Sequence, residues 1–189
     1  MSAREFSENI AETSLLCQSD IINVFRSITT QKNVSSFKSE PRISLTMECL
    51  FKRCETFAAG RGQVNGKEQN LSFSVSDDCS LSGVAMYLPV HNGSTKATIE
   101  IFEDDVKVHS TEVTLNFNGN KYEVVKIIKP IPLVKDKLYM ISVLHFGQMV
   151  FWCTEFKDEV KCNGVTLFVP PYSKFSYLIP ALELVIERF

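Results

Sequence analysis

The chain has 189 residues, 44% of them hydrophobic and 22% charged, with a formal net charge of −2 at pH 7. This composition is typical of a globular domain with a sizeable core and excludes a disordered chain. The slightly acidic balance and the lack of a Lys/Arg run argue against binding to nucleic acid or to acidic membranes.

The N-terminal residues carry charges of both signs and include no apolar signal-like segment. No apolar stretch approaches the roughly 18 residues that span a bilayer. We therefore expect a cytoplasmic protein. In that reducing compartment its six cysteines would remain free thiols: Cys17, Cys49, Cys54, Cys79, Cys153 and Cys162.

The first expected element is a helix over residues 15–31, where apolar residues recur near helical spacing after a capping Ser19 or Asp20. A polar connector follows over 32–42. Residues 45–59 are ambiguous between helix and extended chain. We expect a turn of helix near Met47–Lys52 and then a strand at Cys54–Ala58.

From about residue 70 the hydrophobic period changes to two. Leu71, Phe73 and Val75 alternate with serines, which predicts a half-buried strand that turns at Asp77-Asp78. A second strand is expected at Leu81–Leu88, where Gly83 indicates a bulge or a close backbone approach.

Turn signals separate the remaining strands. Four Asn-Gly dipeptides, at 65–66, 92–93, 118–119 and 163–164, predict type I′ turns, and Asp104-Asp105 predicts a further hairpin. Strands are expected at 96–102, 106–115, 121–128, 138–145, 149–156, 165–169 and 181–188. This spacing predicts an all-β, two-sheet antiparallel β-sandwich after a short N-terminal helical segment.

The sequence offers little catalytic chemistry. The glycine-rich GRGQVNG (60–66) lacks the strand–helix context of a phosphate loop, so we interpret it as a flexible loop. Cys153 and Cys162 flank a possible hairpin and could face each other, but no histidine lies near them, and zinc needs four ligands. His109 and Ser110 point to opposite faces of a strand and cannot act as a pair. We expect no enzyme activity, no cofactor and no metal.

Exposed loops and aromatic side chains near turns are the remaining functional candidates. The expected loops are Gly60–Gly66, Val90–Ser94 and Pro170–Tyr177, and rigid aromatics on loops are good anchors for a partner. The structural alternative is that the rings plug one end of the sandwich. The candidate partner-binding residues are Arg61, His91, Asn92, Trp152, Tyr172, Phe175 and Tyr177.

The order of several segments resembles the PHR domain of BTB–BACK–PHR proteins. The family's EPR-x-x-L stretch is matched by Glu40–Arg42 and Leu45, and its RF-type strand is matched at Phe57. Its I-x-F-x-V strand is matched by Leu71, Phe73 and Val75. Its G-x-x-L-Y strand is matched by Gly83 and Tyr87. Pro130, Ile131, Leu133 and Tyr139 fit a later motif, and Ile179-Pro180 fits the closing strand. The family's W-x-Y is replaced by Gly62 and Val64, and its glutamine before Ile-Pro is Leu178.

The resemblance implies a PHR-like β-sandwich at 40–189, preceded at 1–39 by a tail and helix similar to the end of a BACK region. It further implies a non-catalytic protein-binding module of the kind that recognises substrates for a cullin-3 ubiquitin ligase. Cullin-3 would be reached only through a BTB domain, which this sequence lacks. Two alternatives remain open: a structural or assembly domain that packs against its upstream helix, and a small-ligand or carbohydrate-binding sandwich with Trp152 as a stacking platform.

Overall fold

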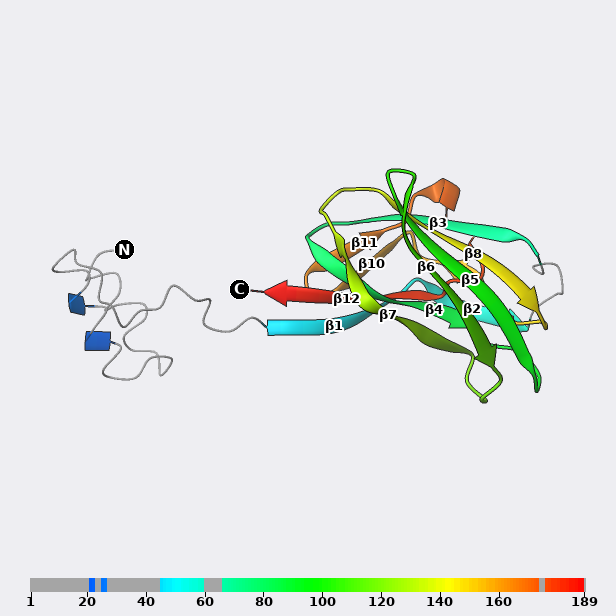
Figure 1. The fold of residues 1–189 in the computed structure, drawn as a ribbon. Coiled ribbons are helices and arrows are strands. Elements are labelled where there is room, and N and C mark those ends of the chain that lie inside the picture. Colours follow the sequence, from blue (N-terminus) through cyan, green and yellow to red (C-terminus); the bar gives the residue numbers. More distant parts are fainter. Residues whose placement is uncertain (1–20, 23–24, 27–44, 60–65, 174–175, 189) are drawn as a thin grey trace. The chain divides into compact units, whose positions relative to one another are not determined.

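The computed structural model describes residues 21–22, 25–26, 45–59, 66–173 and 176–188 (Figure 1). The chain divides into two compact units, Met1–Ile43 and Ser44–Phe189. The described residues of the first unit are helical, but most of the helix expected at 15–31 lies outside the described residues. That helix and a domain boundary at 39/40 therefore stay predictions.

The second unit is built from antiparallel strands. Its strands are β1 (Leu45–Lys52), β2 (Cys54–Ala59), β3 (Glu68–Val75), β4 (Cys79–Tyr87), β5 (Ser94–Glu103), β6 (Val106–Asn116), β7 (Tyr122–Leu133), β8 (Tyr139–Gly147), β9 (Phe151–Phe156), β10 (Glu159–Cys162), β11 (Val165–Phe168) and β12 (Ala181–Arg188), with a 3-10 turn η2 (Pro171–Ser173) before β12. They form a four-stranded sheet β1-β12-β4-β7, a six-stranded sheet β10-β11-β3-β8-β5-β6 and a two-stranded sheet β2-β9 (Figure 1).

The inward side chains of the two larger sheets form one core. In β3 the alternation read from the sequence is confirmed, because Leu71, Phe73 and Val75 are fully buried while the serines between them are half-buried. The partner strand β8 contributes Tyr139, whose ring stacks on that of Phe73 with centroids 5.8 Å apart. Burial of these apolar and aromatic side chains is the main stabilising term of such a fold.

The turn of helix expected near Met47–Lys52 is wrong, because β1 is a strand paired with β12 over its full length. Cys49 and Phe51 face the core while Glu48 and Lys52 are exposed, which is the period of a strand. The local pattern was ambiguous, and the pairing that decides it comes from the other end of the chain. The short strand β10 was also not predicted.

Two hairpin turns have positive φ at both central residues, as a type I′ turn requires. These are Asp104-Asp105 (φ 48° and 64°) and Asn163-Gly164 (φ 47° and 78°). At Asn92-Gly93 and Asn118-Gly119 only the glycine has positive φ, so the type I′ prediction is wrong there. Asn65 lies outside the described residues.

Gly83 sits at the predicted irregularity of β4. The register with β7 shifts between Leu81 and Gly83, which is a bulge. A Cβ at this position would lie 2.5 Å from Cγ1 of Val124 and 3.0 Å from Oε2 of Glu183. Both readings of this glycine, a bulge and a close approach, are therefore confirmed.

The expectation of free thiols is wrong for one pair, because Cys54 and Cys153 form a disulfide across the β2–β9 sheet. Cys153 is thus joined to a cysteine 99 residues away rather than to Cys162. Sequence spacing could not identify the pair, since it depends on how β2 and β9 align. Cys49, Cys79 and Cys162 are free, and Cys17 lies outside the described residues.

Candidate functional site

The candidate residues do not form a single site. Arg61 and Phe175 lie outside the described residues. His91 and Asn92 are exposed on the loop between β4 and β5, while Tyr172 is 73% exposed on η2. Trp152 and Tyr177 pack together with ring centroids 5.4 Å apart.

The aromatic cluster around Tyr177 has a structural role. Tyr177 also contacts Phe156, at 5.6 Å between centroids, and the guanidinium of Arg53 lies 4.7 Å above the Phe156 ring. Trp152 is half-buried, and its Nε1 is buried without a hydrogen-bond partner among the described residues. The outward Trp152 that a carbohydrate platform requires is therefore not present, and the reading that these rings plug one part of the fold fits the cluster better.

Arg53 holds the segment before β12 in place. Its side chain is fully buried and its Nη1 donates hydrogen bonds to the carbonyl oxygens of Ser176 and Ile179, both at 2.9 Å. Burial lowers the pKa of Arg53 to about 10, so it remains charged at neutral pH. Its own backbone N–H donates to the carbonyl of Pro180 at 3.0 Å. This arginine was not singled out from the sequence, because its burial depends on segments more than 120 residues away.

Tyr172 belongs to a segment that covers a sheet edge. β11 pairs with β3 only at Val75 and Ser74, so the earlier part of β3 lacks that neighbour. Ser173 of η2 takes its place, accepting a hydrogen bond from the N–H of Ser72 and donating to the carbonyl of Asn70. Such coverage protects an edge strand from unwanted pairing.

Four segments meet at one end of the unit, which we name the loop end: Gly66, Val90–Ser94, Phe117–Lys121 and Phe146–Val150. In Figure 1 it lies at the right, where β8 ends and β5 begins. Backbone hydrogen bonds join the segments, from Val90 N to Met149 O (2.9 Å), Phe117 N to Gly93 O (3.0 Å) and Gly66 N to His145 O (2.7 Å). These loops are therefore fixed relative to one another.

Large apolar side chains are exposed at the loop end, two from loops and one, Phe146, from the end of β8. Phe117, Phe146 and Met149 are 38%, 48% and 43% exposed. Phe146 and Met149 lie at the ends of the strands predicted at 138–145 and 149–156 and were not among the candidate residues. Their neighbours Asn118-Gly119 and Gly147 were the available signal, since an aromatic or long apolar residue beside a turn is a candidate anchor.

A small cavity of about 180 Å³ lies beside the loop end. We name it the aromatic pocket; its lining includes Lys52, Cys54, Glu55, Phe57, Tyr87, Lys121, Tyr122, Pro180 and Ala181. The rings of Tyr87 and Tyr122 meet edge to face at 6.5 Å, and the Tyr87 hydroxyl donates to Sγ of Cys54 at 3.0 Å. Burial raises the pKa of Tyr87 to about 12, so this hydroxyl stays protonated at neutral pH.

Lysines border the pocket. The Nζ of Lys121 lies 3.5 Å from the centre of the Phe57 ring, a cation–π contact, and Lys52 is exposed. Glu55 pairs with Lys157 at 2.5 Å. Among the described residues, no carboxylate forms an ion pair with Lys52 or Lys121.

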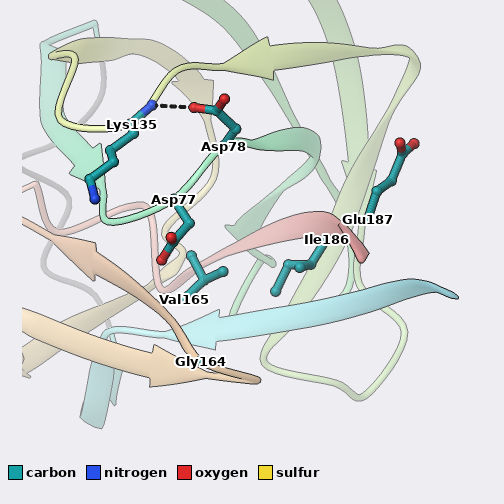
Figure 2. A pocket seen from close by; sticks show the side chains of 7 residues that line it. All are labelled: Asp77, Asp78, Lys135, Gly164, Val165, Ile186 and Glu187. Atoms are coloured by element: carbon teal, nitrogen blue, oxygen red, sulfur yellow. Dashed lines mark hydrogen bonds between the residues drawn. The ribbon is translucent and has the colours of Figure 1, made fainter. Parts of the chain in front are cut away.

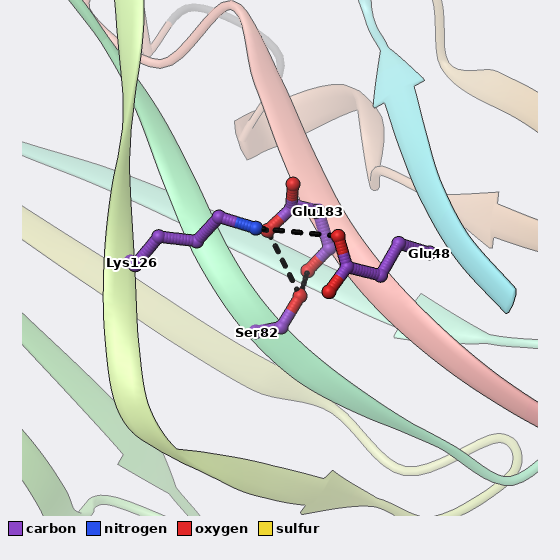
Figure 3. Close-up of polar contacts among 4 residues, drawn as sticks. All are labelled: Glu48, Ser82, Lys126 and Glu183. Carbon is purple, nitrogen blue, oxygen red and sulfur yellow. Dashed lines mark hydrogen bonds and ion pairs between the residues drawn. The ribbon is translucent and has the colours of Figure 1, made fainter. Parts of the chain in front are cut away.

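A second group of charged residues lies on the four-stranded sheet, and we name it the lysine network: Glu48, Ser82, Lys126 and Glu183 (Figure 3). Lys126 of β7 pairs with Glu183 of β12 at 2.7 Å and with Glu48 of β1 at 3.4 Å, and Ser82 donates to Glu183 at 3.1 Å. The hydrogen bond to Glu183 is the main cause that raises the pKa of Lys126. Its charge is thus compensated within the fold.

A larger cavity of about 550 Å³ is lined by both charged and apolar residues (Figure 2): Asp77, Asp78, Lys135, Gly164, Val165, Ile186 and Glu187. Asp78 accepts a hydrogen bond from the backbone N–H of Lys135 at 2.8 Å, and Asp77 accepts one from Ser76 at 2.7 Å. Asp78 therefore holds the turn between β3 and β4 against the β7–β8 connection, whereas the bond of Asp77 lies within the turn. The nearby thiol of Cys79 is a poor nucleophile, because burial and the two aspartates raise its pKa to about 12.

The described residues offer no other reactive constellation. No group of three or more His, Cys, Asp or Glu side chains among them could hold a metal ion. His145 is buried, its Nε2 meets Oγ1 of Thr95, and burial lowers its pKa. Because Thr95 donates its hydroxyl proton to the carbonyl of Phe146, at 2.8 Å, Nε2 is the protonated nitrogen of a neutral ring. His145 is thus a packed core residue.

No protein-family model matches this chain, and a search of curated proteins finds no match. Nor does the described part of the chain contain a helix long and apolar enough to cross a membrane. What is established is an all-β unit with antiparallel sheets, to which a function must be assigned from its own surface.

Proposed function

We propose that this chain is a non-catalytic protein-binding module whose binding surface is the loop end. The observation that carries the proposal is the exposure of Phe117, Phe146 and Met149 at the loop end, whose segments are held together by backbone hydrogen bonds. Exposed apolar side chains on a rigid frame cost little conformational entropy when they bind a partner. His91 and Asn92 provide polar groups on the same end.

The fold supports placing this module with PHR-like β-sandwiches. Two larger antiparallel sheets share one core, and the loops gather at one end, where a sandwich presents its recognition loops. On this proposal the chain recognises substrates, and cullin-3 is recruited only when a BTB domain is joined to it. Function assigned through such a likeness rests on analogy of fold.

Affinity purification with quantitative mass spectrometry tests the proposal. The bait is the full chain, compared with a loop-end variant in which Phe117, Phe146 and Met149 are changed to Ser. A matched variant changes Val106, Val134 and Leu138 to Ser; these apolar residues are also exposed, at 65%, 51% and 47%, but lie on the turns away from the loop end. We expect partners of the wild type to be lost only with the loop-end variant. Equal retention by both variants would contradict the proposal.

A cytoplasmic location is also part of the proposal, and the disulfide provides its test. Cytosolic thiols are kept reduced, so disulfides are rare there. Alkylation of thiols before cell lysis, followed by peptide mapping, should find Cys54 and Cys153 alkylated in a cytosolic pool. Protection of both cysteines by their disulfide in cells would instead place the protein in an oxidising compartment.

A further inference from the structure

The size of the aromatic pocket limits what it can hold. Its volume of about 180 Å³ is well below the roughly 300–1,000 Å³ of sites for drug-sized ligands. One amino-acid side chain is the kind of group that fits. The pocket adjoins the loop end through Lys121, whose carbonyl accepts a hydrogen bond from the N–H of Leu88 at 2.9 Å, so a segment bound at the loop end can reach it.

The inner surface of the pocket favours an apolar side chain. Phe57 is 40% exposed and Tyr122 is half-buried, and both contribute aromatic surface, next to the ring of Pro180. The Tyr87 hydroxyl is already bonded to Cys54, and none of the buried side-chain polar atoms without a partner among the described residues belongs to the lining. An apolar group that enters would displace water without breaking a hydrogen bond.

The border of the pocket favours negative charge. Lys52 and Lys121 form no ion pair with a described carboxylate, while the one carboxylate in the lining, Glu55, is paired with Lys157. On the same face of the sheet the charge of Lys126 is met by Glu183 and Glu48. The positive charges at the pocket therefore remain available to an incoming group.

We infer that the aromatic pocket binds one apolar or aromatic side chain of an acidic peptide segment, whose flanking carboxylates meet Lys52 and Lys121. The inference rests on the proposed protein-binding function and names the chemistry of the segment that is bound. Two separate lysines beside an apolar cavity fit such a segment better than the extended phosphate backbone of a nucleic acid, which is bound along a basic track.

Peptide titrations monitored by NMR on the ¹⁵N-labelled full chain test the inference. The probes are acetyl-Asp-Glu-Phe-Glu-Asp-amide, its Ala version at the central position and its Lys-for-acid version. We expect the acidic Phe peptide to shift the amide signals of Lys52, Phe57 and Tyr122 with a dissociation constant on the order of 1 mM, as for one small pocket. The Ala and Lys versions should shift them at least about tenfold less at equal concentration.

Charge variants separate the pocket from the general charge of the protein. Lys52→Glu combined with Lys121→Glu should weaken the acidic Phe peptide by about tenfold, since each exposed pair is worth a few-fold and reversal adds repulsion. Lys129→Glu combined with Lys135→Glu, two exposed lysines outside the pocket lining, is the control with the same change in net charge and should bind as the wild type does. Equal weakening by both variants would overturn the inference.

Three further results would also overturn it: no shift at the pocket with any peptide at 5 mM or less, equal shifts with the basic peptide, or equal binding of phenylacetate alone. Binding of phosphatidylserine vesicles that depends on Lys52 and Lys121, without peptide binding, would favour a membrane and overturn it as well. Failure here is distinct from failure of the proposed function, because partner capture through Phe117, Phe146 and Met149 is measured separately and could persist.

Discussion

The outward face of the four-stranded sheet contains two regions with lysines in opposite situations. In the lysine network, Lys126 lies among Glu48, Glu183 and Ser82, all supplied by neighbouring strands (Figure 3). In the aromatic pocket, Lys121 lies on an aromatic ring and Lys52 is exposed. The first region satisfies its charge within the fold, whereas the second leaves both charge and apolar surface available to a partner.

This difference separates structural from recognition roles on one sheet. The register of β4 with β7 places Gly83 opposite Lys126 and Tyr87 opposite Tyr122. Side chains alternate between the two faces of a strand, so positions four residues apart lie on the same face, and the two regions therefore share one face of the sheet. Changes in the lysine network should therefore alter stability without altering binding. Changes at the pocket border should do the reverse.

The largest expected effect is loss of the disulfide that borders the pocket. The double variant Cys54→Ser and Cys153→Ser should lose about 2–4 kcal/mol of unfolding free energy under oxidising conditions, because the cross-link closes a long loop in the unfolded chain. Urea denaturation measures this. Wild type with reductant should match the variant, and Cys79→Ser, a free cysteine, is the matched control. A double variant as stable as oxidised wild type would contradict the disulfide.

The next largest effect is expected from a substitution at Gly83, beside the lysine network. Gly83→Ala should lower the unfolding free energy by about 1–3 kcal/mol, because the new methyl group would overlap Val124 and crowd the carboxylate of Glu183. Ser80→Ala on the same strand is the control and should have a smaller effect. Unchanged thermal and urea stability of Gly83→Ala would show that β7 can move away at no cost.

The stability of the fold should depend on pH through His145 of β8. Burial keeps the folded-state pKa of His145 below its usual value near 6.5, so the unfolded chain binds a proton more readily. The contribution of His145 to stability is therefore complete above about pH 6.5 and is lost as the pH falls through the folded-state pKa. Urea midpoints between pH 7.5 and 5 should fall more for the wild type than for His145→Gln. Parallel curves would refute this role.

The smallest effect is expected from Glu183→Gln, which tests whether the lysine network and the aromatic pocket are independent. Glu183→Gln keeps an acceptor for the Ser82 hydroxyl and removes the charge that faces Lys126. We expect a small loss of stability, because Lys126 is 56% exposed and solvent screens its ion pair with Glu183. Binding of the acidic Phe peptide should not change. A clear change in peptide affinity by NMR would mean that the two regions are not independent.

Much of the strand framework could be predicted from the sequence. The period-two alternation of Leu71, Phe73 and Val75 and the Asp104-Asp105 hairpin depend on local chemistry, and both are confirmed. β1 could not be assigned in the same way, since its identity as a strand comes from pairing with β12. The disulfide likewise depends on the alignment of β2 with β9.

The candidate site was less accessible to sequence reasoning. The loop containing His91 and Asn92 was predicted, but the exposed apolar residues beside it were not selected: Met149 was assigned to a strand, and Phe117 and Phe146 lay just outside the predicted strands. The aromatic pocket joins residues from β1, β2, β4, β7 and the segment before β12, so no local motif encodes it. Trp152 and Tyr177 were candidates for partner binding, with plugging of the fold as the alternative; they pack with each other, and Tyr177 also contacts Phe156, over which Arg53 lies.

Site-specific photo-crosslinking in cells tests the central claim most directly. Benzoylphenylalanine replaces Phe146 at the loop end in one sample and Leu138, also exposed but away from the loop end, in the other. We predict light-dependent covalent adducts with the same few proteins in replicate experiments from position 146 and none of these from position 138. Adducts of equal abundance from both positions, or none from position 146, would contradict a protein-binding surface at the loop end.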